Sequence, residues 1–153
     1  MGMLAALKKQ IEVLLSGNDS ADTEADRQHG IRLATATLMA EVARADRVFD
    51  TRELAALREG LQRHFGLTDE ETSMVVDAGL EEAEAAISLQ GFTRPLHEAL
   101  SAGEKAQIVD MLWRVAAADG ELDKHEDALI AKIGELLYVP RSEVLRLKHE
   151  NGL

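Results

Sequence analysis

The chain has 153 residues, of which 46% are hydrophobic, and this is enough to build the core of one ordinary domain. Its formal net charge of −11 argues against nucleic-acid binding by phosphate neutralisation and against docking on an anionic membrane. The absence of cysteine excludes disulfides, thiolate zinc sites and a cysteine nucleophile. We therefore expect a soluble domain that attracts cations or a basic partner.

The N-terminal residues 3–15 carry apolar side chains at helical spacing and predict a short amphipathic helix. A polar stretch follows, so we interpret residues 1–24 as this helix and a linker, and residues 25–153 as the helical domain. The helix either packs on its own domain or docks on a partner. It lacks the unbroken apolar run of a secretory signal, and no apolar stretch is long enough for a bilayer, so we expect a cytoplasmic protein without membrane insertion.

Helical periodicity continues along the rest of the chain. Capping-box patterns at 68–71 and 101–104 open two of the helices, and Gly66 is a plausible C-cap. Gly91 interrupts the pattern, and Pro95 suits the first turn of a short helix. No alternating run indicates a strand, which predicts an all-α, single-domain bundle of about seven or eight helices. The expected helices after the first cover roughly 27–45, 51–65, 68–89, 94–100, 102–118, 124–137 and 140–149.

Two acidic stretches between apolar helices repeat one another. A shift of 73 positions places Asp46 on Asp119, Asp50 on Asp123 and Glu53 on Glu126 without a gap. Such a repeat is typical of a duplicated structural unit. We therefore predict two helix–acidic loop–helix copies that pack with approximate two-fold symmetry.

Four of these acids have a structural explanation. Asp50 to Glu53 and Asp123 to Glu126 are both Asp-x-x-Glu patterns at the start of a helix. Aspartate at the N-cap accepts from free backbone N–H groups, and glutamate at the third position bonds back to the cap. A cap of this kind stabilises a protein by roughly 1 kcal/mol, so these residues need no further role.

Asp46 and Asp119 are harder to explain, because each lies at the C-terminal end of a helix, where the helix dipole disfavours an anion. Asp119, Glu121 and Asp123 place oxygen donors at alternating positions, as a Ca²⁺ or Mg²⁺ site would need. The loop is not an EF-hand, since Lys124 occupies its sixth position. The candidate metal ligands are Asp46, Asp50, Glu53, Asp119, Glu121, Asp123 and Glu126.

Other chemistries find little support. His125 is either a nitrogen ligand for a softer metal or an exposed surface residue, and no Glu-x-x-His pattern of a di-iron bundle is present. There is no Gly-x-Ser-x-Gly motif and no glycine-rich phosphate loop, so we expect no enzyme. Trp113, one turn before the second loop, is either core or an exposed anchor for a partner.

The second acidic stretch, Ala118-Asp119-Gly120 followed by Asp123 and Glu126, resembles the TerB-like family over residues 35–150. The first copy fits less well, because Arg47 stands where glycine is common in the family. The resemblance implies an all-helical, non-enzymatic domain that is associated with stress response and tellurite resistance. It also implies metal binding through the acidic residues.

Two main functional hypotheses follow. In the first, the acidic loops bind a divalent cation within a stress- or tellurite-resistance-related complex. In the second, the domain is a metal-free helical scaffold that binds a protein partner through an apolar groove or through residues 1–15. A metal-dependent hydrolase is a third hypothesis, but the sequence offers it no second catalytic group.

Overall fold

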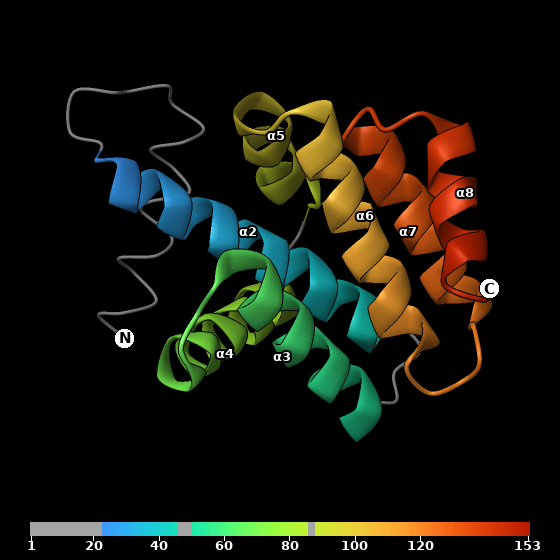
Figure 1. Cartoon of the computed structure of the whole chain (residues 1–153), viewed down its shortest axis with the longest axis horizontal. Helices are drawn as coiled ribbons and strands as arrows, with labels where there is room; N and C mark the ends of the chain where they lie inside the picture. Colours follow the sequence, from blue (N-terminus) through green and yellow to red (C-terminus); the bar gives the residue numbers. More distant parts are fainter. Residues whose placement is uncertain (1–22, 46–49, 86–87) are drawn as a thin grey trace.

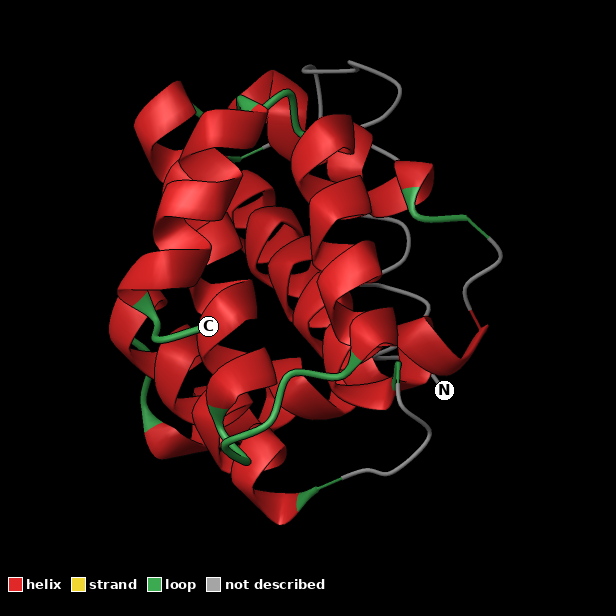
Figure 2. Ribbon diagram, turned by 90° about the vertical axis from the view of Figure 1, so that its right-hand side faces the viewer, coloured by secondary structure: helices red, strands yellow, loops and turns green. Residues whose placement is uncertain are grey.

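The computed structural model describes residues 23–45, 50–85 and 88–153, and the ordered elements in these ranges are all helices (Figures 1 and 2). No strand occurs in them, so the all-α prediction is confirmed. The helix expected over residues 3–15 lies outside the described residues. The helices are α2 (Glu24–Arg44), α3 (Thr51–Phe65), α4 (Asp69–Ala85), α5 (Gln90–Ala99), α6 (Ala102–Ala117), α7 (Lys124–Leu136) and α8 (Arg141–Glu150).

Helix α2 runs through the middle of the bundle and contacts α3, α4, α5, α6 and α7 (Figure 1). The sequence predicted one apolar stripe for it, yet all residues of the stretch 33–40 are buried. The hydroxyls of Thr35 and Thr37 donate to the carbonyls of Ile31 and Leu33, both at 2.8 Å, so their burial leaves no unsatisfied polar group. Helix α2 is therefore the central helix around which the others pack.

The contact between α2 and α4 depends on a glycine, which has no side chain, at position 79. A Cβ atom placed on Gly79 of α4 would lie 2.8 Å from the Cβ of Ala36 and 3.0 Å from its carbonyl carbon. Both residues are buried. Glycine against alanine thus lets the two helix backbones approach closely at this point.

Helix α6 is the second organising element, because it contacts α2, α3, α7 and α8. Trp113 is only 1% exposed, and its indole Nε1–H donates to the carbonyl of Val144 in α8 at 3.1 Å. The prediction of Trp113 as a core residue is confirmed, and the alternative of an exposed anchor is wrong.

Several helix ends agree with the sequence. Gly66 ends α3 with a left-handed φ of 64°. The Thr68–Glu71 pair forms a reciprocal capping box at the start of α4, and the Ser101–Glu104 pair does the same for α6. Local hydrogen bonds therefore mark these boundaries, which is why the sequence predicts them.

Three boundaries differ from the sequence predictions. Helix α2 begins at Glu24, because Thr23 and Asp26 form a capping box upstream of the expected start. Helix α4 ends at Ala85, before the expected end near 89. Helix α5 begins at Gln90, after the carbonyl of Leu89 has accepted two backbone N–H groups, so Pro95 lies inside the helix rather than in its first turn.

The close approach at Gly79 gives a test of the packing. Gly79→Ala should lower the free energy of unfolding by about 1–3 kcal/mol, because the added methyl group has to displace the α2 backbone. The matched control is Gly103→Ala in α6, where no atom lies within 4 Å of the added Cβ. This control should be neutral or stabilising by up to about 1 kcal/mol. Urea unfolding of both variants measures the difference, and equal stabilities would contradict the packing.

The α6 capping box predicts a pH dependence of stability. Hydrogen bonds from the backbone and side chain of Ser101 hold the pKa of Glu104 below its usual value of 4.5. A lowered folded pKa stabilises the protein above the unfolded pKa, and this stabilisation is lost as the pH falls through the folded pKa. Glu104→Gln should therefore reduce the loss of stability between about pH 6 and pH 3. The exposed Glu84→Gln control should retain the wild-type loss, as measured by urea midpoints.

Candidate functional site

The two acidic corners lie at the same end of the bundle. The end of α2, the start of α3 and the loop between α6 and α7 all meet at the lower right of Figure 1. A hydrogen bond to Asp50 raises the pKa of Arg52, and the negative charges of Asp119 and Glu121 raise it further, so the second loop lies within electrostatic reach of the first corner. We call this end the acidic end; its described acids are Asp50, Glu53, Asp119, Glu121, Asp123 and Glu126.

In the first corner, Asp50 is the N-cap of α3. Its Oδ1 accepts the backbone N–H of Arg52 at 2.6 Å, and the Arg52 guanidinium reaches Oδ1 at 3.2 Å and Oδ2 at 2.9 Å. These bonds hold the pKa of Asp50 below its usual range. Asp50 is thus an ionised cap that carries its own counter-ion. Asp46 lies outside the described residues, and its role stays a prediction.

In the second corner, the chain turns at Gly120, which has a left-handed φ of 84°. The Oδ1 atom of Asp119 accepts the backbone N–H of Glu121 at 3.0 Å. A side chain that accepts from the backbone two residues later stabilises a turn. This contact gives Asp119 a structural role despite its unfavourable place at the end of α6.

The start of α7 is capped as predicted. The side chain of Asp123 accepts the backbone N–H of His125 at 2.6 Å, and Glu126 Oε1 accepts the N–H of Asp123 at 3.2 Å. The two residues form a reciprocal capping box. His125 is exposed on the surface, and its Nδ1 lies 3.6 Å from Asp123 Oδ1.

Glu53 and Glu126 hold equivalent positions in the two corners, and both are 0% exposed. Full burial of a glutamate is rare, because removing a carboxylate from water is costly. The sequence predicted their place at the third position of a helix but not their burial. The signal was available, since Glu53 lies four residues before Leu57, and Glu126 lies four before Ile130, on the buried side of each helix.

The donor chemistry of the acidic end matches hard cations, which prefer carboxylate oxygens. Even so, in residues 23–45, 50–85 and 88–153 no group of three or more His, Asp or Glu side chains is arranged to hold a metal ion. Several carboxylate oxygens already accept backbone N–H groups. The full ligand set includes Asp46 and therefore stays a prediction, either as one ion shared by the two corners or as a separate site at each.

A family model described as tellurite resistance protein TerB matches residues 32–149. The chain belongs to the TerB family. The resemblance inferred from the acidic stretches is thereby confirmed over almost the same residues. No curated protein and no solved structure matches the chain. Each helix of this TerB domain in the described ranges is too short or too polar to cross a membrane.

The cap at α7 can be separated from any binding role by two substitutions. Asp123→Ala should lower the free energy of unfolding by about 1 kcal/mol, because the N-cap acceptor is lost. Asp123→Asn should keep most of the stability, since asparagine is an equally good cap. The control Glu121→Ala removes an exposed acid from the same loop and should stay within about 0.5 kcal/mol of wild type. A destabilised Glu121→Ala variant would show that the loop contains contacts beyond these.

Proposed function

We propose that this TerB-family domain is a non-enzymatic cytoplasmic module that binds a divalent cation, Ca²⁺ or Mg²⁺, at its acidic end. The observation that carries the proposal is that the two acidic corners lie at one end of the bundle (Figure 1), where a hydrogen bond to Asp50 and the charges of Asp119 and Glu121 raise the pKa of Arg52. Acids that are far apart in the sequence thus converge on one cationic group. A metal ion at this end has to compete with Arg52 for the same acids.

The acids differ in what they can offer to an ion. Asp50 is engaged by Arg52 through both carboxylate oxygens. Asp119 and Asp123 each use one oxygen for a backbone N–H, and a carboxylate has further acceptor capacity beyond one such bond. We propose that Asp119, Glu121 and Asp123 supply the first ligands, and that Arg52 is displaced from Asp50 when an ion binds.

The biological setting is proposed from the family alone. The family description names tellurite resistance, and we propose that this domain acts in a tellurite- or stress-related protein complex. A non-enzymatic role is consistent with the sequence, which offers no nucleophile motif and no phosphate loop.

A metal-free interaction scaffold is the second candidate. The observation that favours it is the use of the corner acids in ordinary caps and turns, because these contacts explain Asp50, Asp119 and Asp123 without an ion. The two candidates differ in one measurable property, the response of the domain to divalent cations.

Calorimetric and NMR titrations with Ca²⁺, Mg²⁺, Mn²⁺ and Zn²⁺ test the cation proposal. We expect saturable binding of Ca²⁺ or Mg²⁺ with a dissociation constant of about 0.1–1 mM, the range of weak oxygen sites. Asp119→Asn should weaken it, and Arg52→Gln should strengthen it, because Arg52 competes for the same acids. The control Asp77→Asn removes an exposed charge from α4 and should change little.

A lack of specific cation binding would favour the metal-free interaction scaffold. If the domain shows no heat and no resonance shifts at about 10 mM of each ion, the acidic end is not a cation site at physiological concentrations. Equal weakening by Asp119→Asn and Asp77→Asn would indicate non-specific attraction to a chain of net charge −11.

A further inference from the structure

A groove of about 680 Å³ lies over α7 and α8, with Trp113 of α6 at its base. Its apolar floor includes Ala128 and Ala131, two exposed small residues that are three positions apart on α7. Leu145 of α8, which is 40% exposed, forms the other side. Small side chains flanked by a larger apolar one are suited to close approach of a helix.

The charge of the groove is opposite to that of the chain. Four cations line it, namely Lys124, Lys132, Arg141 and Lys148, against two acids, Asp127 and Glu135. The whole chain has 17 Lys and Arg residues against 28 Asp and Glu residues. A local excess of positive charge on an acidic protein is an electrostatic signature of an acidic partner.

Three of these cations are available for a partner. Lys148 Nζ lies 3.1 Å from Asp127 Oδ1 and 5.7 Å from the centre of the Trp113 ring, so it is already engaged. Lys124, Lys132 and Arg141 are exposed and form no ion pair with any residue in the described part of the chain.

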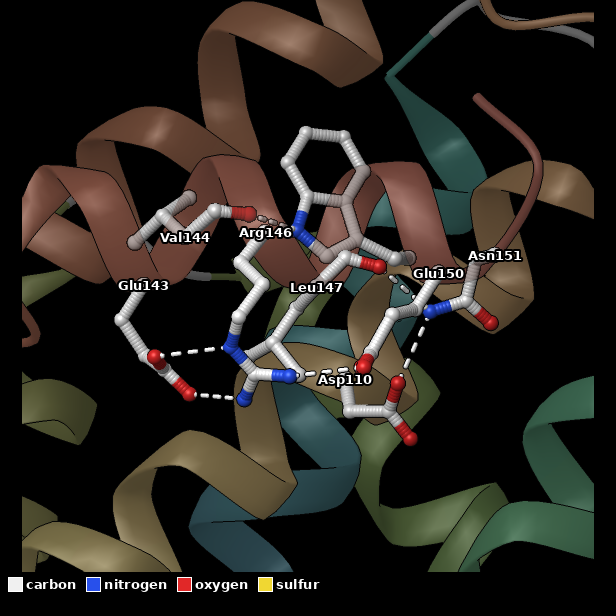
Figure 3. A network of polar contacts seen from close by, with 8 residues as sticks. Asp110, Glu143, Val144, Arg146, Leu147, Glu150 and Asn151 are labelled. Atoms are coloured by element: carbon white, nitrogen blue, oxygen red, sulfur yellow. Dashed lines mark hydrogen bonds and ion pairs between the residues drawn. The ribbon is translucent and has the colours of Figure 1, made fainter.

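Polar contacts hold α8 in place beside the groove. Figure 3 shows Arg146 between Glu143 and Glu150, while the Asn151 side chain donates to Asp110 Oδ1 of α6 at 2.8 Å. The Arg146 pairs lie within α8, whereas the Asn151 bond and the bond from Trp113 to Val144 join the end and the start of α8 to α6. A rigid groove lowers the entropic cost of binding, because little has to be ordered on this side of the interface.

Helices α7 and α8 also meet at close range. A Cβ atom on Gly134 would lie 2.8 Å from Val144 Cγ2, so these two helices pack with no room for a side chain at that point. The two helices that line the groove are therefore in direct contact.

We propose that this α7–α8 groove docks an acidic amphipathic helix of a partner protein. Apolar side chains of that helix lie over Ala128, Ala131 and Leu145, and its flanking Asp or Glu side chains pair with Lys132, Arg141 and Lys124. Charge complementarity selects this occupant, since Lys124, Lys132 and Arg141 would repel a basic helix. The proposal does not depend on cation binding at the acidic end, because none of its contacts uses the acids proposed there as ligands.

The experiment is an NMR titration of the full ¹⁵N-labelled chain with a designed peptide of about 15 residues. Its leucines follow helical i, i+4 and i+7 spacing, and glutamates flank them. A second peptide keeps the leucines and replaces every glutamate with lysine. We expect the acidic peptide to shift resonances of α7 and α8 around the groove, and the basic peptide to leave them unchanged.

Charge-reversal variants test whether the groove cations contribute to peptide binding. Lys132→Glu with Arg141→Glu should weaken the acidic peptide by about tenfold or more, since two charge pairs become repulsive. Arg27→Glu, an exposed charge reversal at the start of α2, is the control and should change the affinity by less than about threefold. A helical circular dichroism spectrum confirms that each variant folds.

Four results would overturn the proposal. They are no shifts at about 1 mM acidic peptide, shifts that map elsewhere, equal binding of both peptides, and an unchanged affinity of the double variant. Binding of the same face to anionic vesicles in place of the peptide would assign the groove to a membrane surface. Self-association that the double variant abolishes would assign it to a second copy of this chain.

Discussion

The burial of the central part of α2 on all sides is the constraint on which the rest of the structure depends. Its stretch 33–40 is buried throughout, and its small residues let five other helices contact it. A helix that is buried all round needs neighbours on every face. The end of α2, the start of α3 and the loop between α6 and α7 lie at one end of the bundle (Figure 1).

That placement gives the same carboxylates two possible tasks. Asp50, Asp123 and Glu126 start helices, and the Asp119 side chain closes a turn. The charges of Asp50, Asp119 and Glu121 also act together on Arg52 at this end of the molecule. Folding thus explains why each acid has its position, while the concentration of negative charge at this end is the basis of the proposed cation site.

The helices, their caps and the family could be predicted from the sequence, because each is encoded in short stretches of residues. The Ser101–Glu104 box and the turn at Gly66 need only a few neighbouring residues to form. The continuous burial of residues 33–40 in α2 could not be predicted, since alanines and threonines give a weak periodic signal. The interior position of Pro95 was missed because the helix starts upstream, at the turn around Leu89.

The site was accessible only in part. The repeat identified the acids of both corners, but their convergence depends on how α3 and α6 pack, which no local pattern encodes. The burial of Glu53 followed from its register with Leu57 and was overlooked in favour of its cap position. The α7–α8 groove combines residues from three helices, so its charge becomes visible only in the folded chain. The two-fold relation between the repeats stays a prediction.

The convergence of the two corners can be measured directly by pulsed electron spin resonance on a chain that has no cysteine of its own. Spin labels at Thr51→Cys and Glu121→Cys, both exposed positions, report the separation of the corners. We expect a narrow distribution below about 20 Å, since the charge of Glu121 acts on the neighbouring Arg52. A separation near 30 Å, the length of a helix such as α2, would place the corners at opposite ends and contradict a shared acidic end.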